Sequence, residues 1–218
     1  PDVVKKATIA IEDKDFYKHQ GFSITGIGRS VVSIFLFNNL QGGSTITQQL
    51  VKKALLGEEK TLSRKLKELL LAIEIERRFT KDEILWMYLN QIPYGSNAYG
   101  IEAASQTFFD KPAADLNWSE AALLASLPKA PTYYSPYGSH FPELITRRNN
   151  LLGRMKNLAV ITDSEHVVAT KETPDKTLCS ICTNIMQQSA VVAAVSWTYA
   201  PFAFTPLVIE VPALPEIP

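Results

Sequence analysis

The chain has 218 residues, of which 46% are hydrophobic and 20% charged, a composition that excludes a disordered or collagen-like protein. Lys plus Arg and Asp plus Glu each number 22, so no excess of positive charge favours non-specific binding to nucleic acid. Two cysteines are too few for a disulfide-stapled scaffold.

The first expected element is a helix over residues 2–12. The chain opens inside this helix without a signal peptide, so we expect it to be a piece of a longer polypeptide. At the end of the helix stand Glu12, Asp13 and Asp15, followed by His19. A carboxylate that loses solvent beside aromatic rings has a raised pKa and can serve as a general base. A solvated helix end with a structural histidine would carry the same residues.

A dense apolar run, Val31–Phe37, comes next. It is far shorter than the roughly 20 residues that a membrane-spanning helix needs. Two interpretations remain open at this point. The run is either a helix of the core, or an element that rests its apolar face in the lipid interface with Arg29 at the level of the headgroups.

The segment from Gln41 to Lys52 combines two glycines, two hydroxyl residues, two amides and a lysine. Backbone N–H groups at a helix start, together with such side chains, are the parts of an anion site. The spacing is not that of a P-loop. An ordinary capped helix is the alternative, although the pair Gln48-Gln49 supplies more uncharged donors than a surface helix needs.

A charged helix is expected from about Thr61 to Arg78, with Thr61 or Ser63 as its cap. Lys60, Arg64 and Glu68 follow one another at intervals of four residues, so they share a helical face. Such a row is usually a solvated, ion-paired surface. Together with Lys52 it could instead hold a pyrophosphate, with Glu68 orienting the cations or acting as a second carboxylate.

Three further helices are expected, at 81–90 after a Thr80 cap, at 119–127 and at 142–158, whereas long strands are hard to find. The fold class is therefore mainly α. The composition changes near Pro174, since only four charged residues and none of the glycines lie beyond it. We expect a working domain over 1–173, and over 174–218 a Pro-rich, charge-poor linker or the truncated start of a following module.

Five motifs in order resemble glycosyltransferase family 51, the peptidoglycan glycosyltransferase domain of class A penicillin-binding proteins and of monofunctional transglycosylases. Together they cover about residues 3 to 160. They are Glu12-Asp13 with Phe16, His19 and Gly21; Gly42 through Lys52; Arg64-Lys65 with Glu68; Lys81 through Ser105; and Glu120 through Pro131.

This resemblance implies a lysozyme-like helical domain with a small hydrophobic subdomain at the membrane interface, which favours an interfacial position for Val31–Phe37. It implies an inverting enzyme that polymerises lipid II into β-1,4-linked glycan strands and releases polyprenyl pyrophosphate. The implied partners are lipid II, the growing glycan strand, the membrane surface and a covalently linked transpeptidase domain in the full-length protein. The implied location is the outer face of the bacterial cell membrane.

The resemblance also implies roles for individual residues. Glu12 is the base that removes the proton of the acceptor hydroxyl. Lys52, Arg64, Lys65 and Lys60 neutralise the departing pyrophosphate, and Glu68 positions them. The donor side is lined by Ser44, Thr45, Gln48 and Gln49, while Asp13, Phe16 and His19 support the site. The chain departs from the family at Lys60, where arginine is expected, and lysine lacks the two-pronged geometry of that side chain.

No cofactor and no metal site is expected from the residues themselves, although a divalent cation on the pyrophosphate fits the chemistry. Two rival functions are distinguishable. One is a lipid-tethered binding module without activity, against which the first three intact motifs argue. The other is a muramidase, since lysozyme-like folds usually cleave glycans with two carboxylates.

Overall fold

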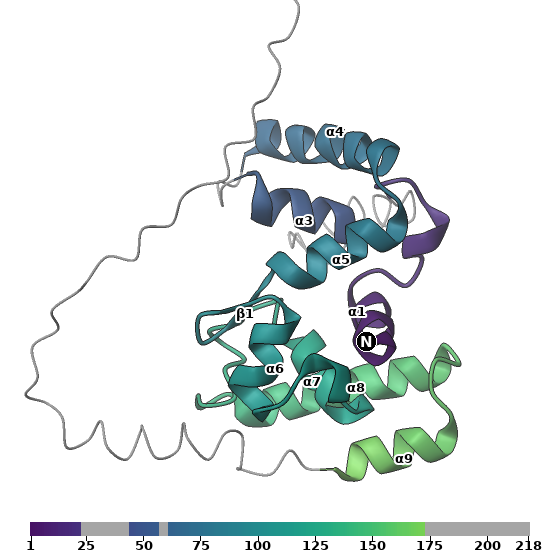
Figure 1. Ribbon diagram of the computed structural model, residues 1–218, viewed down its shortest axis with the longest axis vertical. Coiled ribbons are helices and arrows are strands. Elements are labelled where there is room, and N and C mark those ends of the chain that lie inside the picture. The colour runs from purple at the N-terminus through teal and green to yellow at the C-terminus, as the bar shows by residue number, and fades with distance from the viewer. Residues whose placement is uncertain (23–43, 57–60, 173–218) are drawn as a thin grey trace, which may run out of the picture.

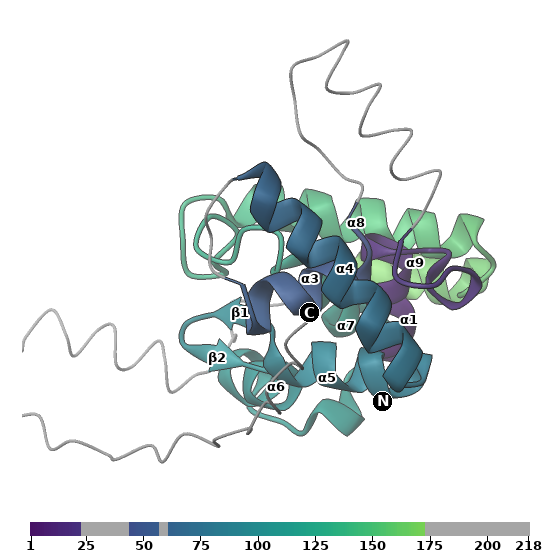
Figure 2. The ribbon, with the colours of Figure 1, turned by 90° about the horizontal axis from the view of Figure 1, so that it is seen from above.

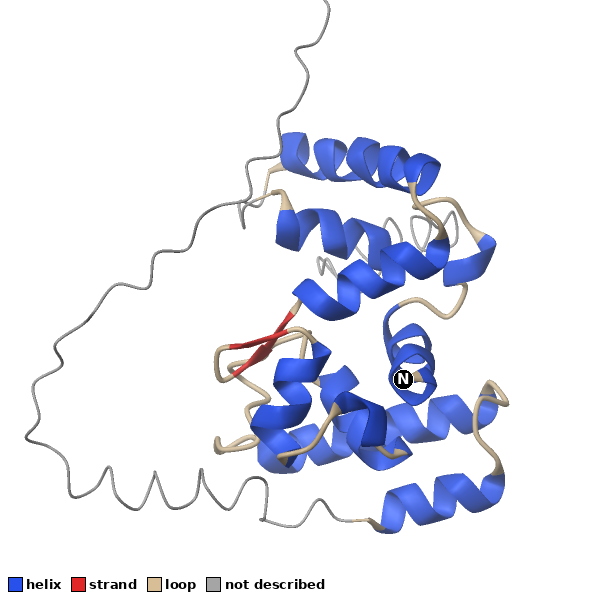
Figure 3. Ribbon diagram, in the orientation of Figure 1, coloured by secondary structure: helices blue, strands red, loops and turns tan. Residues whose placement is uncertain are grey.

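The computed structural model describes residues 1–22, 44–56 and 61–172, and these form a helical domain (Figures 1 and 3). The prediction of a mainly α protein is confirmed. The α-helices of the described part are α1 (Asp2–Glu12), α3 (Ile46–Ala54), α4 (Leu62–Arg78), α5 (Lys81–Gln91), α6 (Ile101–Phe109), α7 (Trp118–Ser126), α8 (Phe141–Asn157) and α9 (Asp163–Lys171). Short 3₁₀ turns lie at Phe16–Lys18 and Ala113–Asp115. Val31–Phe37, Lys60 and the segment 174–218 lie outside the described residues.

The expected helix starts are found where side chains can satisfy the first N–H groups of a helix. Thr45 caps α3 and Thr61 caps α4 through their hydroxyl oxygens. α5 begins with a reciprocal capping box between Thr80 and Glu83. α7 and α9 begin in the same way, so local sequence determines where most of these helices start.

The helices form two groups (Figure 1). In one group α3 packs between α4 and α5, and in the other α1 packs on α7 and α8, with α9 against α8. Seen from above, α4 crosses over α3 on the outside of the molecule (Figure 2). A single hydrophobic core connects the groups through α1, α3, α5 and α6–α8. No helix in the described ranges is both long and apolar enough to traverse a bilayer.

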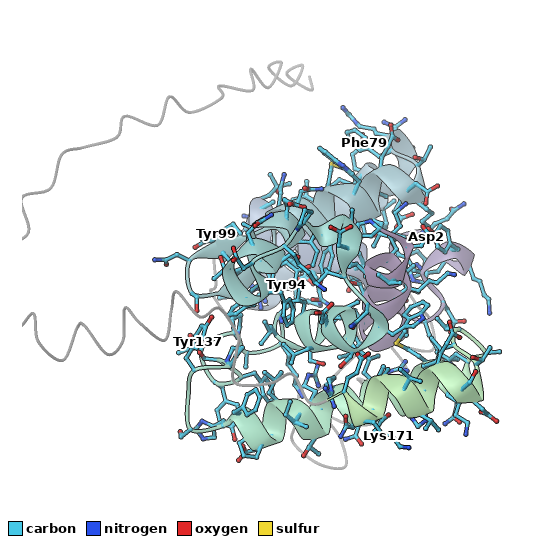
Figure 4. All side chains as sticks on the ribbon, turned by 60° about the horizontal axis from the view of Figure 1, so that its bottom comes forward. Asp2, Phe79, Tyr94, Tyr99, Tyr137 and Lys171 are labelled. Carbon is cyan, nitrogen blue, oxygen red and sulfur yellow. The ribbon has the colours of Figure 1, made fainter. Side chains whose placement is uncertain are left out.

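A small antiparallel hairpin lies between the groups, where β1 (Pro93–Gly95) pairs with β2 (Ala98–Tyr99). Gly100 closes the hairpin with a φ of +82°, and a Cβ atom there would lie 2.6 Å from the carbonyl oxygen of Asn90. Only glycine fits this close approach. The end of α5 and the start of α6 are thereby held together, and Tyr94 of β1 is placed in the interior (Figure 4).

Candidate active site

Glu12 is the last residue of α1 and contacts the other helix group through α3. Gln49 Nε2 donates a hydrogen bond of 2.6 Å to Glu12 Oε2. The hydroxyl of Tyr88, on α5, donates in turn to Gln49 Oε1 at 3.2 Å. Because the amide oxygen accepts from Tyr88, the amide nitrogen is directed at Glu12. Three helices therefore fix the orientation of this half-buried carboxylate.

Two buried tyrosines form the apolar side of this carboxylate's surroundings. Burial raises the pKa of Tyr88 and of Tyr94, and the negative charge of Glu12 raises the pKa of each further. Both hydroxyls are therefore protonated and neutral at physiological pH. Both residues belong to a sequence motif quoted above, but nothing in the sequence assigned them a role beside Glu12.

Asp13, the neighbouring acid, is buried and points in another direction. Its two carboxylate oxygens lie 3.0 and 2.9 Å from His19 Nε2. Asp13 Oδ2 also accepts the backbone N–H of Ile46 in the first turn of α3, at 3.2 Å. A carboxylate is stabilised at a helix N-terminus, and the buried ring of Phe16 packs edge-on against His19. Asp13, Phe16 and His19 thus connect the end of α1 to the beginning of α3.

The start of α3 is anchored by its hydroxyl residues. Thr45 Oγ1 donates to the carbonyl oxygen of Gly21 at 2.8 Å and accepts the N–H of Gln48 at 3.2 Å. The side chain of Gln48 is buried, whereas Ser44 and Gln49 are half-buried. The structure therefore divides the four residues expected on the donor side. Thr45 and Gln48 belong to the framework, while Ser44 and Gln49 reach the charged groups.

The cations of α4 are organised around Glu68, whose side chain is only 2% exposed. Arg64 Nη1 donates to Glu68 Oε2 at 2.8 Å. Lys65 forms an ion pair with the other carboxylate oxygen and donates to Ser44 Oγ at 2.9 Å. The row that usually marks a solvated surface is here partly buried. Lys65 is nevertheless about half-exposed, so a ligand can reach its ammonium group.

Lys52 lies in the last turn of α3, three residues after Gln49, and is half-buried. Residues three apart are neighbours on a helix surface, about one turn from each other. α3 therefore contacts Glu12 through Gln49, and Ser44, just before its cap, contacts the α4 cations. The same helix also carries Lys52. Lys60, the remaining expected cation, lies outside the described residues.

A second polar cluster beneath the site was not expected from the sequence. Thr47 Oγ1 donates to Glu76 at 2.5 Å, and Lys81 is ion-paired with the same carboxylate at 2.7 Å. The ammonium of Lys81 also lies 4.5 Å from the ring centre of Phe16, a cation–π contact. These contacts hold α3, α4 and α5 to the turn after α1. Thr47 and Lys81 fall within the quoted motifs, which is the signal that could have pointed to them.

Among the residues described, no three His, Cys, Asp or Glu side chains gather in a way that could hold a metal ion. Chemically, the arrangement offers one accessible carboxylate, oriented by an amide, and a set of cations oriented by a buried carboxylate. This combination suits a proton acceptor at one end and an anionic leaving group at the other.

The Transglycosylase family model matches residues 1–156. Penicillin-binding protein 1F of Bacillus subtilis is 46% identical over 170 residues, which are 78% of this chain and 24% of that protein. Penicillin-binding protein 1A of Aquifex aeolicus is 47% identical over 167 residues, 76% of this chain and 23% of that protein. A crystal structure of penicillin-binding protein 1A from Haemophilus influenzae aligns with 67% of this chain and 19% of its own, at 27% identity and a TM-score of 0.37. The chain thus spans about a quarter of the length of these curated relatives.

Proposed function

This chain belongs to the transglycosylase family of class A penicillin-binding proteins, and we propose that it polymerises lipid II into peptidoglycan glycan strands. The growing glycan, carried on polyprenyl pyrophosphate, is the donor. The 4-hydroxyl of the GlcNAc of lipid II is the acceptor. A bond forms between this oxygen and the anomeric carbon of the donor while the bond to the pyrophosphate breaks, so that an α linkage becomes a β-1,4 linkage.

In this reaction the acceptor proton passes to Glu12 and the electron pair of the broken bond remains with the pyrophosphate. Lys52, Arg64 and Lys65 are the described cations that would stabilise the growing negative charge, and Lys60 shares this role by resemblance. Glu68 accepts from Arg64 and is ion-paired with Lys65, so it holds both cations in place.

One observation supports the proposal above all. α3 touches Glu12 through Gln49, and just before its cap it touches the α4 cations through Ser44. Both contacts are made from one short stretch, Ser44 to Gln49, so a single element holds the base and the charge sink near each other. A base and a charge sink brought together in this way fit the transfer of one sugar onto another.

Glycan hydrolysis fits the same residues less well. A muramidase of lysozyme type uses two carboxylates, one of which gives a proton to the leaving oxygen. Glu68, the second acid of the site, is buried, and each of its two carboxylate oxygens is paired with a cation. Neither oxygen is free to approach a leaving sugar oxygen, so sugar transfer with pyrophosphate as the leaving group is favoured.

The substitution Glu12→Gln tests the role of the base. It removes the proton acceptor while conserving shape, so we expect kcat to fall by about a factor of 1000, within the range typical of general bases. Binding of lipid II should change by less than about a factor of two, because little of the binding site is altered. The measurements are glycan polymerisation in detergent micelles and lipid II binding by fluorescence.

Asp15→Asn is the matched control, since Asp15 lies three residues further on and pairs only with the exposed Lys18 among the described residues. This variant should polymerise at the wild-type rate. Turnover by Glu12→Gln similar to that of Asp15→Asn would show that Glu12 is not the base. Soluble muropeptides in place of polymer would favour the muramidase.

We extend the proposal to location and partners. The outer side of α4 presents Leu66, Leu70 and Ile73 to solvent, an apolar stripe that suits contact with a lipid surface. We propose that the chain acts at the outer face of the bacterial cell membrane. We also propose that 1–173 is the catalytic domain, and that 174–218 leads toward a linked transpeptidase domain in the full-length protein, as the names of its relatives suggest.

A further inference from the structure

A pocket of about 430 Å³ lies where the end of α1 meets α8. It is lined by residues that include Ile11, Tyr134, Glu143, Arg147, Asn150 and Arg154. Ile11 directly precedes Glu12, so the pocket begins one residue from the proposed base. Of the cations assigned to the pyrophosphate, the three that the structure describes take no part in it, because they lie on α3 and α4 in the other helix group (Figure 1).

Two arginines give the pocket its chemical character. Arg147 is held in place, since its Nε donates to the carbonyl oxygen of Ser126 at 3.0 Å and its guanidinium lies 5.6 Å from the ring centre of Tyr134. Arg154 donates to the carbonyl oxygen of Ile11 at 3.4 Å. Neither arginine forms an ion pair with any residue in the described ranges. Against these two charges stands one acid, the exposed Glu143, so the pocket has a net positive charge.

The loop between α7 and α8, which contains Pro131 and Tyr134, also connects the pocket to the surroundings of Glu12. A Cβ atom on Gly95 would lie 3.1 Å from the carbonyl oxygen of Pro131, so this loop packs closely on β1. The preceding residue on β1 is Tyr94, whose pKa is raised in part by the charge of Glu12. The same loop carries Tyr134 into the pocket three residues later. The segment from Pro131 to Tyr134 therefore links the pocket to the strand that carries Tyr94.

We propose that this pocket binds a carboxylate of the acidic peptide branch carried by a substrate sugar. The inference rests on the proposed function, since a peptidoglycan precursor carries an acidic peptide branch on the sugar next to the one with the reacting hydroxyl. Guanidinium groups bind carboxylates through two parallel hydrogen bonds, whereas an uncharged sugar has no need of two unpaired arginines. The pyrophosphate is already matched by the cations of α3 and α4.

Arg154→Gln tests the pocket on the full chain. Arg154 is exposed and makes only the bond to Ile11 within the described residues, so the variant should fold normally. We expect KM for lipid II to rise about tenfold with kcat nearly unchanged, because a charge-assisted contact outside the reacting bonds is lost. Lys156→Gln is the control, since Lys156 is on the same helix but pairs with Asp163 outside the pocket. It should behave as the wild type.

The substrate supplies the decisive comparison. With lipid II and donor whose peptide carboxylates are all amidated, the wild type should show the raised KM, and Arg154→Gln should add nothing to it. An equal effect of Arg154→Gln on amidated and unmodified substrate would overturn the inference. If the wild type makes no polymer from either substrate, the proposed function itself fails, which is a different outcome.

Two mixed reactions distinguish donor from acceptor as the source of the branch. In the first, an unmodified tetrasaccharide donor meets amidated lipid II, and in the second the modifications are reversed. Loss of the Arg154→Gln effect in the first reaction alone assigns the pocket to the acceptor. Loss in the second alone assigns it to the donor. Persistence in both reactions would contradict binding of a single carboxylate branch.

Discussion

Two adjacent carboxylates at the end of α1 lie in different surroundings. Glu12 is half-buried and contacts an amide that a substrate hydroxyl could replace. Asp13 is buried, and it binds the first turn of α3 and His19. Removal of such a satisfied buried acceptor leaves its partners unpaired, which costs stability. The pair therefore separates the proposed chemical role of Glu12 from the positioning role of Asp13.

Lys52 offers a test of the charge sink at the residue scale. Lys52→Ala should raise KM and lower kcat together, because a cation on the pyrophosphate helps both to bind the donor and to stabilise the departing charge. We expect kcat/KM to fall by about a factor of 100, the loss typical of one electrostatic group in a site. Initial rates of polymerisation over a range of lipid II concentrations provide both constants.

Lys53→Ala is the neighbouring control, since Lys53 is exposed on the same turn of α3. It should leave both constants within about a factor of two of the wild type, as expected for a charge exposed to solvent and salt. If Lys52→Ala also changes neither constant, Lys52 does not belong to the site.

At this scale the sequence predicts caps better than contacts. Thr61 and Thr80 were expected at helix starts, and each caps one. A cap is a local signal, since acceptor and donor are three residues apart. The bond from Gln49 to Glu12 joins residues 37 positions apart, and no local pattern encodes it. The roles of Tyr88 and Tyr94 beside Glu12 were missed for the same reason, since both residues are far from Glu12 in the sequence.

α4 shows the limit of pattern analysis at the scale of one element. Its bounds were predicted within a residue, and leucines at helical spacing usually mark a buried face. In the structure, Leu66 and Leu70 are each 59% exposed and Ile73 is 41% exposed. Glu68 and Ala72, on the opposite side of the helix, are buried. The helix thus turns its acid inward to hold cations and its leucines outward.

Leu66→Ser/Leu70→Ser tests whether this stripe meets lipid. Partial insertion of each leucine should contribute about 1 kcal/mol, so the double variant should bind anionic vesicles about thirtyfold more weakly. Co-sedimentation with vesicles measures the binding. Polymerisation in detergent should stay near the wild-type rate.

The pair Val167→Ser/Val168→Ser removes exposed apolar side chains from α9, which lies at the far end of the molecule from α4 (Figure 1). Vesicle binding of this control should be unchanged. Equal loss in both double variants would indicate a general effect of surface hydrophobicity and would exclude a specific role for α4.

Other elements were missed for identifiable reasons. α6 ends at Asp110 in the left-handed conformation, without the glycine that usually marks a helix end. The hairpin strands have only three and two residues, too few for an alternating pattern. α9 was missed as well, although its capping box of Thr162 and Glu165 is a local signal that the sequence does contain.

At the scale of the whole molecule, Arg148 holds the second helix group together. It is buried on α8, and its guanidinium donates to Ser119 of α7 at 3.0 Å and to the carbonyl oxygen of Glu172, just after α9, at 2.7 Å. Burial lowers the pKa of Arg148, against an opposing effect of the charge of Glu172. Since the ordinary pKa of arginine is above 12, the side chain remains charged.

Arg148→Met should therefore lower the free energy of unfolding by about 3 kcal/mol, because several buried acceptors lose their donor at once. Urea denaturation followed by circular dichroism measures the change. Lys156→Met, on an exposed part of the same helix, should alter the free energy by less than about 0.5 kcal/mol. A midpoint for Arg148→Met equal to that of Lys156→Met would contradict this role.

The two helix groups meet at the proposed active site. α1 belongs to one group and α3 to the other, and the bonds from Gln49 to Glu12 and from Ile46 to Asp13 cross between them. Sequence motifs indicated which residues belong together, but not that they would come from two groups joined at this point. That arrangement depends on packing across the whole chain.

The bond between Gln49 and Glu12 has a consequence for repeated turnover. An enzyme that extends a polymer must release the product from its general base before the next acceptor hydroxyl can bind there. In this chain the proposed base is the carboxylate oxygen of Glu12 that Gln49 contacts. In the proposed reaction the Gln49 amide is the partner of that oxygen while no acceptor is bound, and the incoming hydroxyl takes its place. Each round of extension would then begin with the exchange of one uncharged donor on the carboxylate for another.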